Sequence, residues 1–200
     1  EDYMRNGQLK PGYNLQIGVI SEYIVSYDIF HNPSDTKTLI PFLEKIKSQN
    51  IEVKNVVADA GYESFSNYEY LKINNYVSYI KPIYYEKSKT RKYKKTIYFR
   101  NPETEKKVRY NYEFRKLSKE SKDNIESEFG KQLRMNRSIQ VEGAFAVIKE
   151  DMKLRKLKVR GKNSVKREIA LFCIAYNFNR YISKLSKNKI GTVLHSLKSA

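Results

Sequence analysis

The chain has 200 residues, enough for one domain with a sizeable core, and a formal net charge of +17. So basic a chain favours an anionic partner, nucleic acid above all, although its richness in Lys, Asn, Ile and Tyr is also typical of an AT-rich genome. The single cysteine, Cys173, excludes an internal disulfide framework, and the apolar runs are too short to span a membrane. The polar opening EDYMRNGQLK shows no signal peptide.

The first quarter of the chain reads as two strands and a helix. Residues 13–20 and 24–30 are rich in β-branched residues and predict two strands that pair as a hairpin. Ser34 or Asp35 then suits the N-cap of a helix that continues through Ser48 and buries one apolar face.

A strand–helix–strand unit follows. Residues 53–58 predict a buried strand that ends at Asp59, and Gly61 breaks it. A helix over about residues 66–73 and a short strand over 77–80 complete the unit. A hairpin, a βαβ unit and terminal helices together indicate an α/β domain with a mixed sheet flanked by helices.

Residues 84–118 are dense in Lys, Arg and Tyr and differ from their surroundings. Within them, KKTIYFRNPETEKKVRYNYE predicts a β-hairpin that turns at Asn101-Pro102. We interpret the segment as a β-rich basic insertion in the domain. Its aromatic residues either stack on unpaired bases while its cations follow phosphates, or cover an edge of the core, and the sequence leaves both open.

Helical periodicity returns after the insertion. It predicts helices over residues 120–134, 139–154 and 164–185. The polar tail 186–200 is expected to be loose. Residues 1–185 would then form one domain.

Two acidic residues are candidates for catalysis. Asp59 follows an apolar strand, and ligand sites in open α/β sheets lie beyond the carboxyl ends of strands, although an ordinary turn aspartate is commoner there. Glu142 lies beside the apolar stripe of its predicted helix, with Lys149 two turns further along nearly the same face. Taken alone, Glu142 would be a solvated glutamate.

Two carboxylates far apart in sequence suit Mg²⁺ (or Mn²⁺). Magnesium takes oxygen ligands and is held by one or two carboxylates together with substrate phosphates. In two-metal phosphoryl transfer, one ion activates the attacking water or 3′-OH and the other stabilises the leaving oxygen. One Cys and two scattered His are too few for a zinc site, and no Gly-rich phosphate loop is present.

Three segments resemble the DDE transposases of bacterial insertion sequences, specifically the IS1182-like group within the IS4-like type. They are NGQLKPGYNLQIGVISEYIVSYDIFHNPSDTKTLIPFLE, VVADAGYESFSNYEYL and RSIQVEGAFAVIKEDMKLRKLKVRGKNSVKREIALFCIAYNFNR. The segments are spread from residue 6 to residue 180, so the resemblance spans nearly the whole chain. The resemblance implies an RNase H-like fold and Mg²⁺-dependent cleavage and transfer of DNA strands. It also implies double-stranded DNA of transposon ends and target as partner, a bacterial cytoplasmic, nucleoid-associated location, and a possible homodimer of the intact protein.

The resemblance assigns roles by position. Asp59 in ADAGY matches the second catalytic Asp and Glu142 in VEGAFAVIK matches the catalytic Glu, so both would bind the metal. The family pattern around this Glu also contains a Tyr, an Arg and, after six intervening residues, a Lys. Lys149 matches that Lys and would contact transposon-end DNA. Arg137 is the nearest match for the Arg, one residue further from the Glu than usual, and the place of the Tyr holds Arg134 or its neighbours.

The first catalytic Asp of the family has no match here. It lies on the first strand of the fold, which sits between the second and fourth strands, and the hairpin at 13–30 would be the second and third. Asp2, Asp28 and Asp35 do not occupy its place. We therefore expect the first strand to be missing, and the isolated chain to be marginally stable and catalytically inactive.

The densest cationic run is KLRKLKVRGK at 153–162. It predicts DNA backbone contacts by Lys156, Lys158 and Arg160 rather than a merely solvated surface. Three hypotheses stay open: a transposase or its remnant, a non-catalytic nucleic-acid-binding module, and a hydrolytic nuclease. The first requires the two catalytic carboxylates to come within metal-bridging range, and the second does not.

Overall fold

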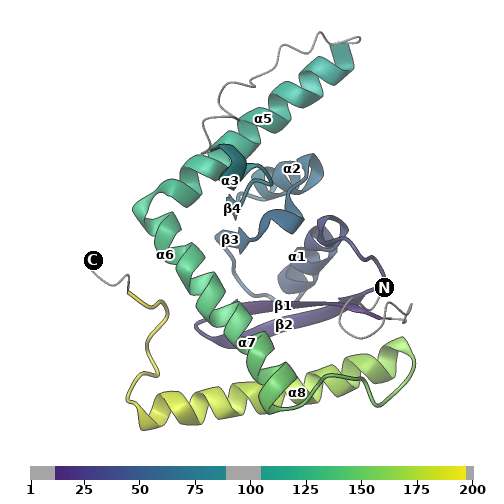
Figure 1. Cartoon of the computed structure of the whole chain (residues 1–200), viewed down its shortest axis with the longest axis vertical. Helices are drawn as coiled ribbons and strands as arrows, with labels where there is room; N and C mark the ends of the chain where they lie inside the picture. Colours follow the sequence, from purple (N-terminus) through teal and green to yellow (C-terminus); the bar gives the residue numbers. More distant parts are fainter. Residues whose placement is uncertain (1–11, 89–104, 197–200) are drawn as a thin grey trace.

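The computed structural model describes residues 12–88 and 105–196, except the side chains of 105–111 (Figure 1). It confirms the expected mixed α/β class, with one antiparallel and one parallel pair of strands flanked by helices. The elements in chain order are β1 (Asn14–Ile20), β2 (Tyr23–Phe30), α1 (Leu39–Ser48), β3 (Asn55–Ala58), α2 (Phe65–Ile73), β4 (Val77–Ile80), α3 (Tyr85–Ser88), α5 (Glu105–Glu126), α6 (Glu128–Arg137), α7 (Gly143–Ala146) and α8 (Lys162–Ser186).

Strands β1 and β2 form the predicted antiparallel hairpin, with Asn14 opposite Phe30. The two turn residues, Ser21 and Glu22, both have positive φ, as a tight hairpin turn requires. The register shifts by one residue beyond Gly18, which makes a bulge in β2. The hairpin thus carries a short polar turn at one end and a kink close to it.

The predicted βαβ unit is also confirmed. Strands β3 and β4 pair in parallel, with Ala58 beside Ile80, and α2 connects them. Ser64 caps α2 by accepting a hydrogen bond from the backbone N–H of Asn67. The core of the βαβ unit consists of apolar side chains of α1, α2 and the strands: Leu39, Phe42, Leu43, Ile46, Val56, Tyr68, Leu71, Ile80 and, from α5, Leu117.

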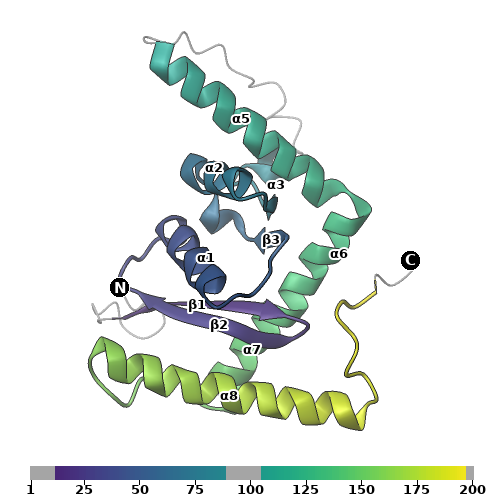
Figure 2. The same ribbon diagram turned by 180° about the vertical axis from the view of Figure 1, so that it is seen from behind.

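The two strand pairs do not join into one sheet among the described residues. A cavity of about 660 Å³ lies between β1 and β3, with apolar side chains of α1 such as Leu39 and Phe42 in its wall. Figures 1 and 2 show the hairpin and the βαβ unit as separate layers on either side of α1. Each of β1 and β3 therefore has one edge without a neighbouring strand in this part of the chain.

The basic segment before the terminal helices differs from its prediction. Residues 105–113, most of the second half of the predicted β-hairpin, belong to helix α5, whereas the rest of the predicted hairpin lies outside the described residues. Leu117, Ser121 and Ile125 recur at four-residue spacing and are buried, so this end of the helix is fixed by packing. A helix that is already nucleated extends at little cost in free energy. It therefore continues through residues whose local preference is for a strand.

The boundaries of the next helices also need correction. The predicted helix 120–134 is broken at Ser127, whose hydroxyl accepts a hydrogen bond from Gly130 N–H and caps α6. A Cβ at Gly130 would lie 1.9 Å from the carbonyl oxygen of Asn124, so only glycine permits this close turn. The predicted gap between 134 and 139 is absent, because α6 continues through π-helical turns on both sides of α7.

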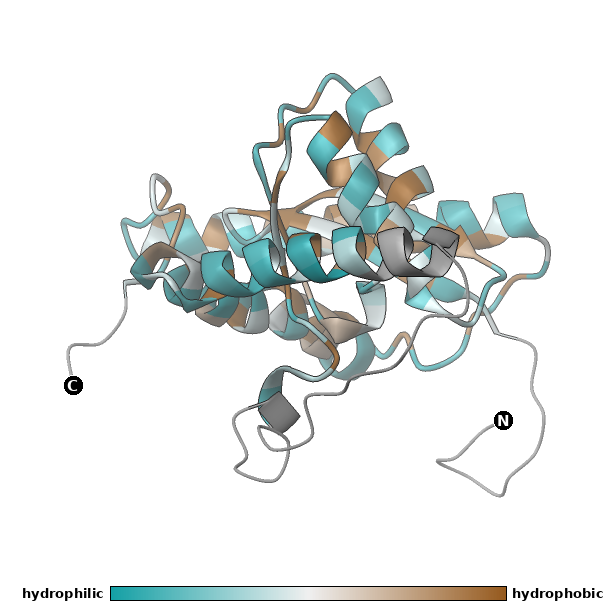
Figure 3. Cartoon of the chain, turned by 90° about the horizontal axis from the view of Figure 1, so that it is seen from above, coloured by the Kyte–Doolittle hydropathy of each residue, from teal (hydrophilic) through white to brown (hydrophobic). Residues whose placement is uncertain are grey.

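Helix α8 packs across β2, on the side away from α1 (Figure 2). Its buried residues join those of β2 and of the α7 region in a second core: Ile24, Ile29, Ala144, Ile148, Val165, Ile169, Cys173 and Tyr176. The side chain of Asn177 exchanges two hydrogen bonds with the backbone of Ile24. Several helices carry both teal and brown residues along their length in Figure 3, as amphipathic helices do. Within the described ranges, every helix is too short or too polar to cross a bilayer.

The C-terminal segment makes contacts that a loose tail would not make. Val193 and His195 bind α6 and its extension through hydrogen bonds with Asn136 and Gln140. The ring of His195 also lies 3.4 Å from the carboxylate of Glu22. Polar side chains turned inward from α6 therefore hold this segment, and its Leu194 also packs against the small core that contains Ile125 and Leu133.

Candidate active site

Asp59 is the first residue after β3, at the carboxyl end of the parallel strands. Its carboxylate accepts a hydrogen bond of 2.9 Å from the backbone N–H of Gly61, which fixes the turn that follows. Because β3 and β4 are in register, Lys81 stands beside Asp59, and its N–H donates to the carbonyl oxygen of Ala58. The Asp59 side chain is 49% exposed, so it is held in place but open to a ligand.

A polar network lies behind Asp59. A Cβ at Gly61 would contact both the Asp59 carboxylate, at 3.1 Å, and the Asp35 carboxylate, at 3.2 Å. Amide groups of Asn14 and Gln16 donate to Asp35, which therefore faces β1 instead of capping a helix.

Tyr62 completes this network by donating its hydroxyl to Gln16. Burial raises the pKa of Tyr62 above its usual value, and the nearby charges of Asp35 and Asp59 raise it further. The hydroxyl therefore stays protonated at neutral pH and serves as a donor.

Glu142 ends the first π-helical turn, Ser138–Glu142. Its two carboxylate oxygens accept hydrogen bonds from the Ser138 hydroxyl, at 2.9 Å, and from the Arg137 guanidinium, at 3.2 Å. The side chain is 62% exposed. No backbone N–H is among these partners, so neighbouring side chains alone orient Glu142.

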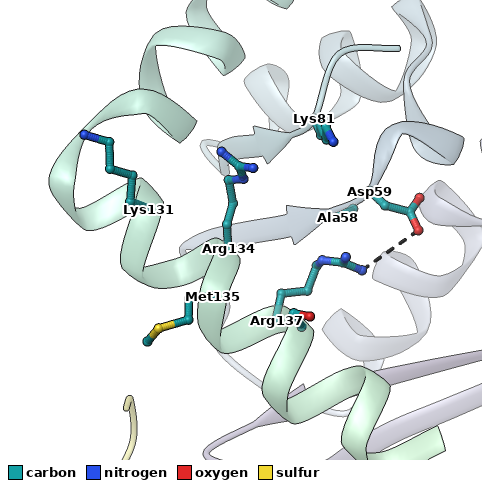
Figure 4. A pocket seen from close by; sticks show the side chains of 8 residues that line it. Ala58, Asp59, Lys81, Lys131, Arg134, Met135 and Arg137 are labelled. Carbon is teal, nitrogen blue, oxygen red and sulfur yellow. Dashed lines mark ion pairs between the residues drawn. The ribbon is translucent and has the colours of Figure 1, made fainter. Parts of the chain in front are cut away.

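Arg137 brings the two predicted catalytic residues together. One of its terminal nitrogens lies 3.9 Å from Asp59 Oδ2 (Figure 4), and the other lies 3.2 Å from Glu142 Oε1. Asp59 thus approaches the guanidinium from the end of β3, and Glu142 approaches the same guanidinium from the helical run. Two carboxylates and one cation leave a net negative charge at this point.

A pocket of about 430 Å³ opens beside Asp59 (Figure 4). Besides Asp59 and Arg137, its wall contains Lys81, Lys131 and Arg134. Sequence reasoning gave these three no firm role. The available signals were the three-residue spacing of Lys131, Arg134 and Arg137 and the equivalent positions of Asp59 and Lys81 after their strands.

The other predicted DNA-binding residues lie apart from this pocket. Lys149 is exposed in the second π-helical turn, Val147–Asp151, where its ammonium lies 5.2 Å from the centre of the Phe145 ring. Lys149 follows Glu142 by seven residues, which would be two turns of an α-helix. Because the π-helical turns are wider, this spacing no longer corresponds to two turns here.

The cationic run precedes α8 as an exposed loop. Lys156, Lys158 and Arg160 are all exposed there, and none of them lines the pocket beside Asp59. The backbone N–H of Lys158 donates to the carboxylate of Glu168 at 3.1 Å. The loop is thereby tied to α8 while its cationic side chains stay in solvent.

Asp59 and Glu142 are the residues of this site that suit a divalent metal. Both offer hard, exposed oxygen ligands of the kind that Mg²⁺ and Mn²⁺ take, and both already face one cationic group. Within residues 12–88 and 105–196, no three or more Asp, Glu, His or Cys residues are grouped as a metal site. A metal held by this pair would need further ligands from substrate, water or another acidic residue.

Comparison with known proteins identifies the family. The family described as "Transposase DDE domain" matches residues 83–182, half of the chain, including Arg137, Glu142 and Lys149 but not Asp59. No curated protein and no solved structure matches the chain. The mixed α/β architecture is consistent with the RNase H-like fold of such domains, which typically use a divalent metal and have DNA as substrate. The chain belongs to the DDE transposase domain family.

Proposed function

We propose that the chain is the catalytic part of an insertion-sequence transposase of the IS1182-like group, which cleaves DNA and joins strands with the aid of Mg²⁺ or Mn²⁺. The observation that supports this most is the approach of Asp59 and Glu142 to the same guanidinium of Arg137, although 82 residues separate them in the 200-residue sequence. A binding module would not need two exposed carboxylates at one point beside a cationic pocket.

The carboxylates of Asp59 and Glu142 would hold the metal in this proposal. When bound, such an ion lowers the pKa of a coordinated water or 3′-OH and neutralises charge that develops on the phosphate. Asp59 is anchored by Gly61 N–H at the end of β3, and Glu142 is oriented by Ser138 and Arg137. Asp59 would therefore be a fixed metal ligand and Glu142 an adjustable one.

Arg137 and the lysines would act on the DNA. The Arg137 guanidinium now faces two carboxylates and has the fork geometry that binds phosphate oxygens bidentately. We expect it to exchange a carboxylate for a phosphate when DNA binds. Lys149 would contact the transposon end, and Lys156, Lys158 and Arg160 would contact the backbone further away.

Substitution of the carboxylates tests the proposal. In the protein encoded by the complete reading frame, Asp59→Asn or Glu142→Gln should reduce Mg²⁺-dependent cleavage of labelled transposon-end DNA by at least about a hundredfold, since electrostatic stabilisation is lost. Glu150→Gln is the matched control, because Glu150 is an exposed carboxylate of the same helical run and pairs with Arg155. Full cleavage by Asp59→Asn would refute the proposal. Unchanged DNA binding with no cleavage by any version would favour a non-catalytic module.

The space between β1 and β3 bears on the third acidic residue that the resemblance implies. Each strand has an unpaired edge there among the described residues, and the cavity of about 660 Å³ separates them. We propose that a strand carrying this residue fits between them, and that the 200-residue chain alone does not join DNA strands. A strand-transfer assay with Mg²⁺ checks this, and robust product from this chain would contradict it.

A further inference from the structure

The pocket beside Asp59 gathers positive charge from two separate elements. Lys81 comes from the carboxyl end of β4, and Lys131 and Arg134 come from α6 (Figure 4). Lys81 is placed by the register of β3 and β4, which sets it beside Asp59. Lys131 and Arg134 are three residues apart, so they project from neighbouring turns of one helix face.

These cations are only partly neutralised. Lys81 forms an ion pair of 2.9 Å with Glu86. Arg134 contacts Tyr85 instead of a carboxylate: it donates to the hydroxyl, and its guanidinium lies 5.2 Å from the ring centre. Lys131 is exposed, and neither it nor Arg134 has an acidic partner within residues 12–88 and 105–196. The pocket therefore keeps an excess of positive charge next to Asp59.

Arg134 is also held in position. The Tyr85 ring that it covers is itself buried, and it belongs to the small core with Tyr79, Ile125 and Leu133. A guanidinium stacked on a fixed ring loses less side-chain freedom when it binds an anion. This distinguishes the pocket from an ordinary surface patch of flexible lysines.

We propose that Lys81, Lys131 and Arg134 form a binding site for the phosphodiester backbone of DNA, which holds the strand next to the phosphate that reacts at Asp59. The claim that a phosphate reacts at Asp59 rests on the proposed function, whereas the binding site for the backbone does not. A guanidinium fork and two ammonium groups bind phosphate oxygens. None of these contacts selects a base, so the site is independent of sequence.

Salt-dependent DNA binding tests the site. The 200-residue chain is titrated against a fluorescein-labelled 30-base-pair duplex of arbitrary sequence, in EDTA, from about 50 to 200 mM salt. The double variant Lys131→Ala/Arg134→Ala should raise Kd about tenfold at the lower salt concentration. It should also reduce the slope of log K against log salt by about 2, because two phosphate contacts are lost.

The matched control removes two cations from the opposite side of the strands. Lys47 and Lys72 lie at the C-terminal ends of α1 and α2, which lead back to the amino ends of β3 and β4. Lys47→Ala/Lys72→Ala makes the same change in net charge. It should alter Kd less than about threefold and leave the slope unchanged.

The possible results separate the two proposals. If the pocket variant behaves like the control, the backbone site is refuted while the catalytic proposal stands. If the unchanged chain shows no salt-dependent binding at all, the backbone site is again refuted, and the catalytic proposal is decided by the cleavage assay with Asp59→Asn and Glu142→Gln. Lys131→Ala alone changes only an exposed side chain, and circular dichroism should confirm its fold. A slope reduced by about 1 in this variant supports the site, and an unchanged slope in it overturns the role of Lys131.

Discussion

Two groups of opposite charges in this molecule use the same chemistry in different surroundings. At the turn of the β1–β2 hairpin, Glu22 faces Lys184 at 3.1 Å, Arg180 at 3.5 Å and His195 at 3.4 Å. Beside β3, Asp59 and Glu142 share Arg137. The Glu22 side chain is 13% exposed and that of Lys184 is 4% exposed, against 49% for Asp59 and 62% for Glu142.

This difference in burial separates a structural cluster from a candidate site. A buried charge must keep its partner, because an unpaired one is costly away from water. Lys184 accordingly also donates to the carbonyl oxygens of Ser21 and Thr192, so it joins the hairpin turn to the C-terminal segment. An exposed carboxylate loses little when its partner leaves, which is what exchange with a metal or phosphate requires.

The largest effect is expected from breaking the buried cluster. Glu22→Gln should lower the free energy of unfolding by roughly 2 kcal/mol, somewhat less than for a fully buried pair because Lys184 keeps two carbonyl partners. Urea unfolding at pH 7 measures it. The comparison variant Glu142→Gln should change stability by less than about 0.5 kcal/mol, as exposed pairs do. Equal losses in the two variants would remove the distinction.

Lowering the pH should reveal the same contrast between the buried cluster and the exposed site, with an effect on stability of intermediate size. Burial acts to raise the pKa of Glu22, but the hydrogen bond from Lys184 and the charges of Arg180, Lys184 and His195 outweigh it and hold the pKa below its usual 4.5. This stabilisation is present above about pH 4.5 and is lost as pH falls through the lower, folded value.

Unfolding measured between pH 6 and pH 3 checks this expectation. Glu22→Gln should lose less stability over that range than the unchanged chain. The variant should still lose some, because Asp28 also has a lowered pKa: burial acts to raise it, but the hydrogen bond from Lys166 and the charge of Lys45 outweigh this. Identical pH profiles for the two proteins would contradict the role of Glu22.

Only a small effect on stability is expected at Arg137. Arg137→Ala should cost less than about 1 kcal/mol, because both of its carboxylate partners are exposed. In a double-mutant cycle with Glu142→Gln, the coupling should also stay below about 1 kcal/mol. A coupling of 2 kcal/mol or more would show that the pair is a structural feature instead of an exchangeable one.

Local patterns were sufficient for the strands and for the position of Asp59. The hairpin and βαβ unit follow from runs of β-branched residues and from Gly61, and they place Asp59 at a strand end. The break at Ser127 could not be predicted, because it depends on the close approach of Gly130 to Asn124 across two helices. The N-terminal part of helix α5, before residue 120, was missed because packing at the far end of the helix overrides the local strand preference of a Tyr-rich segment.

The site was predictable only in part for a related reason. Glu142 could be chosen only by resemblance, since an exposed glutamate on an amphipathic helix has no distinctive local pattern. Lys81 depends on the register between β3 and β4, and Asp35 depends on its hydrogen bonds with amides of β1. Contacts between elements distant in sequence determine both positions, so periodicity along the chain does not predict them.

The unpaired edges of β1 and β3 have a consequence for handling the protein in solution. Their sequences, NLQIGVI and NVVA, contain no charged residue and no proline, the two features that usually protect an exposed strand edge. No strand of residues 12–88 or 105–196 pairs with these edges, so their backbone N–H and C=O groups can pair with a strand of another molecule. At high concentration, we therefore expect this basic chain to aggregate through intermolecular β-pairing despite its charge, and a lysine placed in β1 to slow that aggregation.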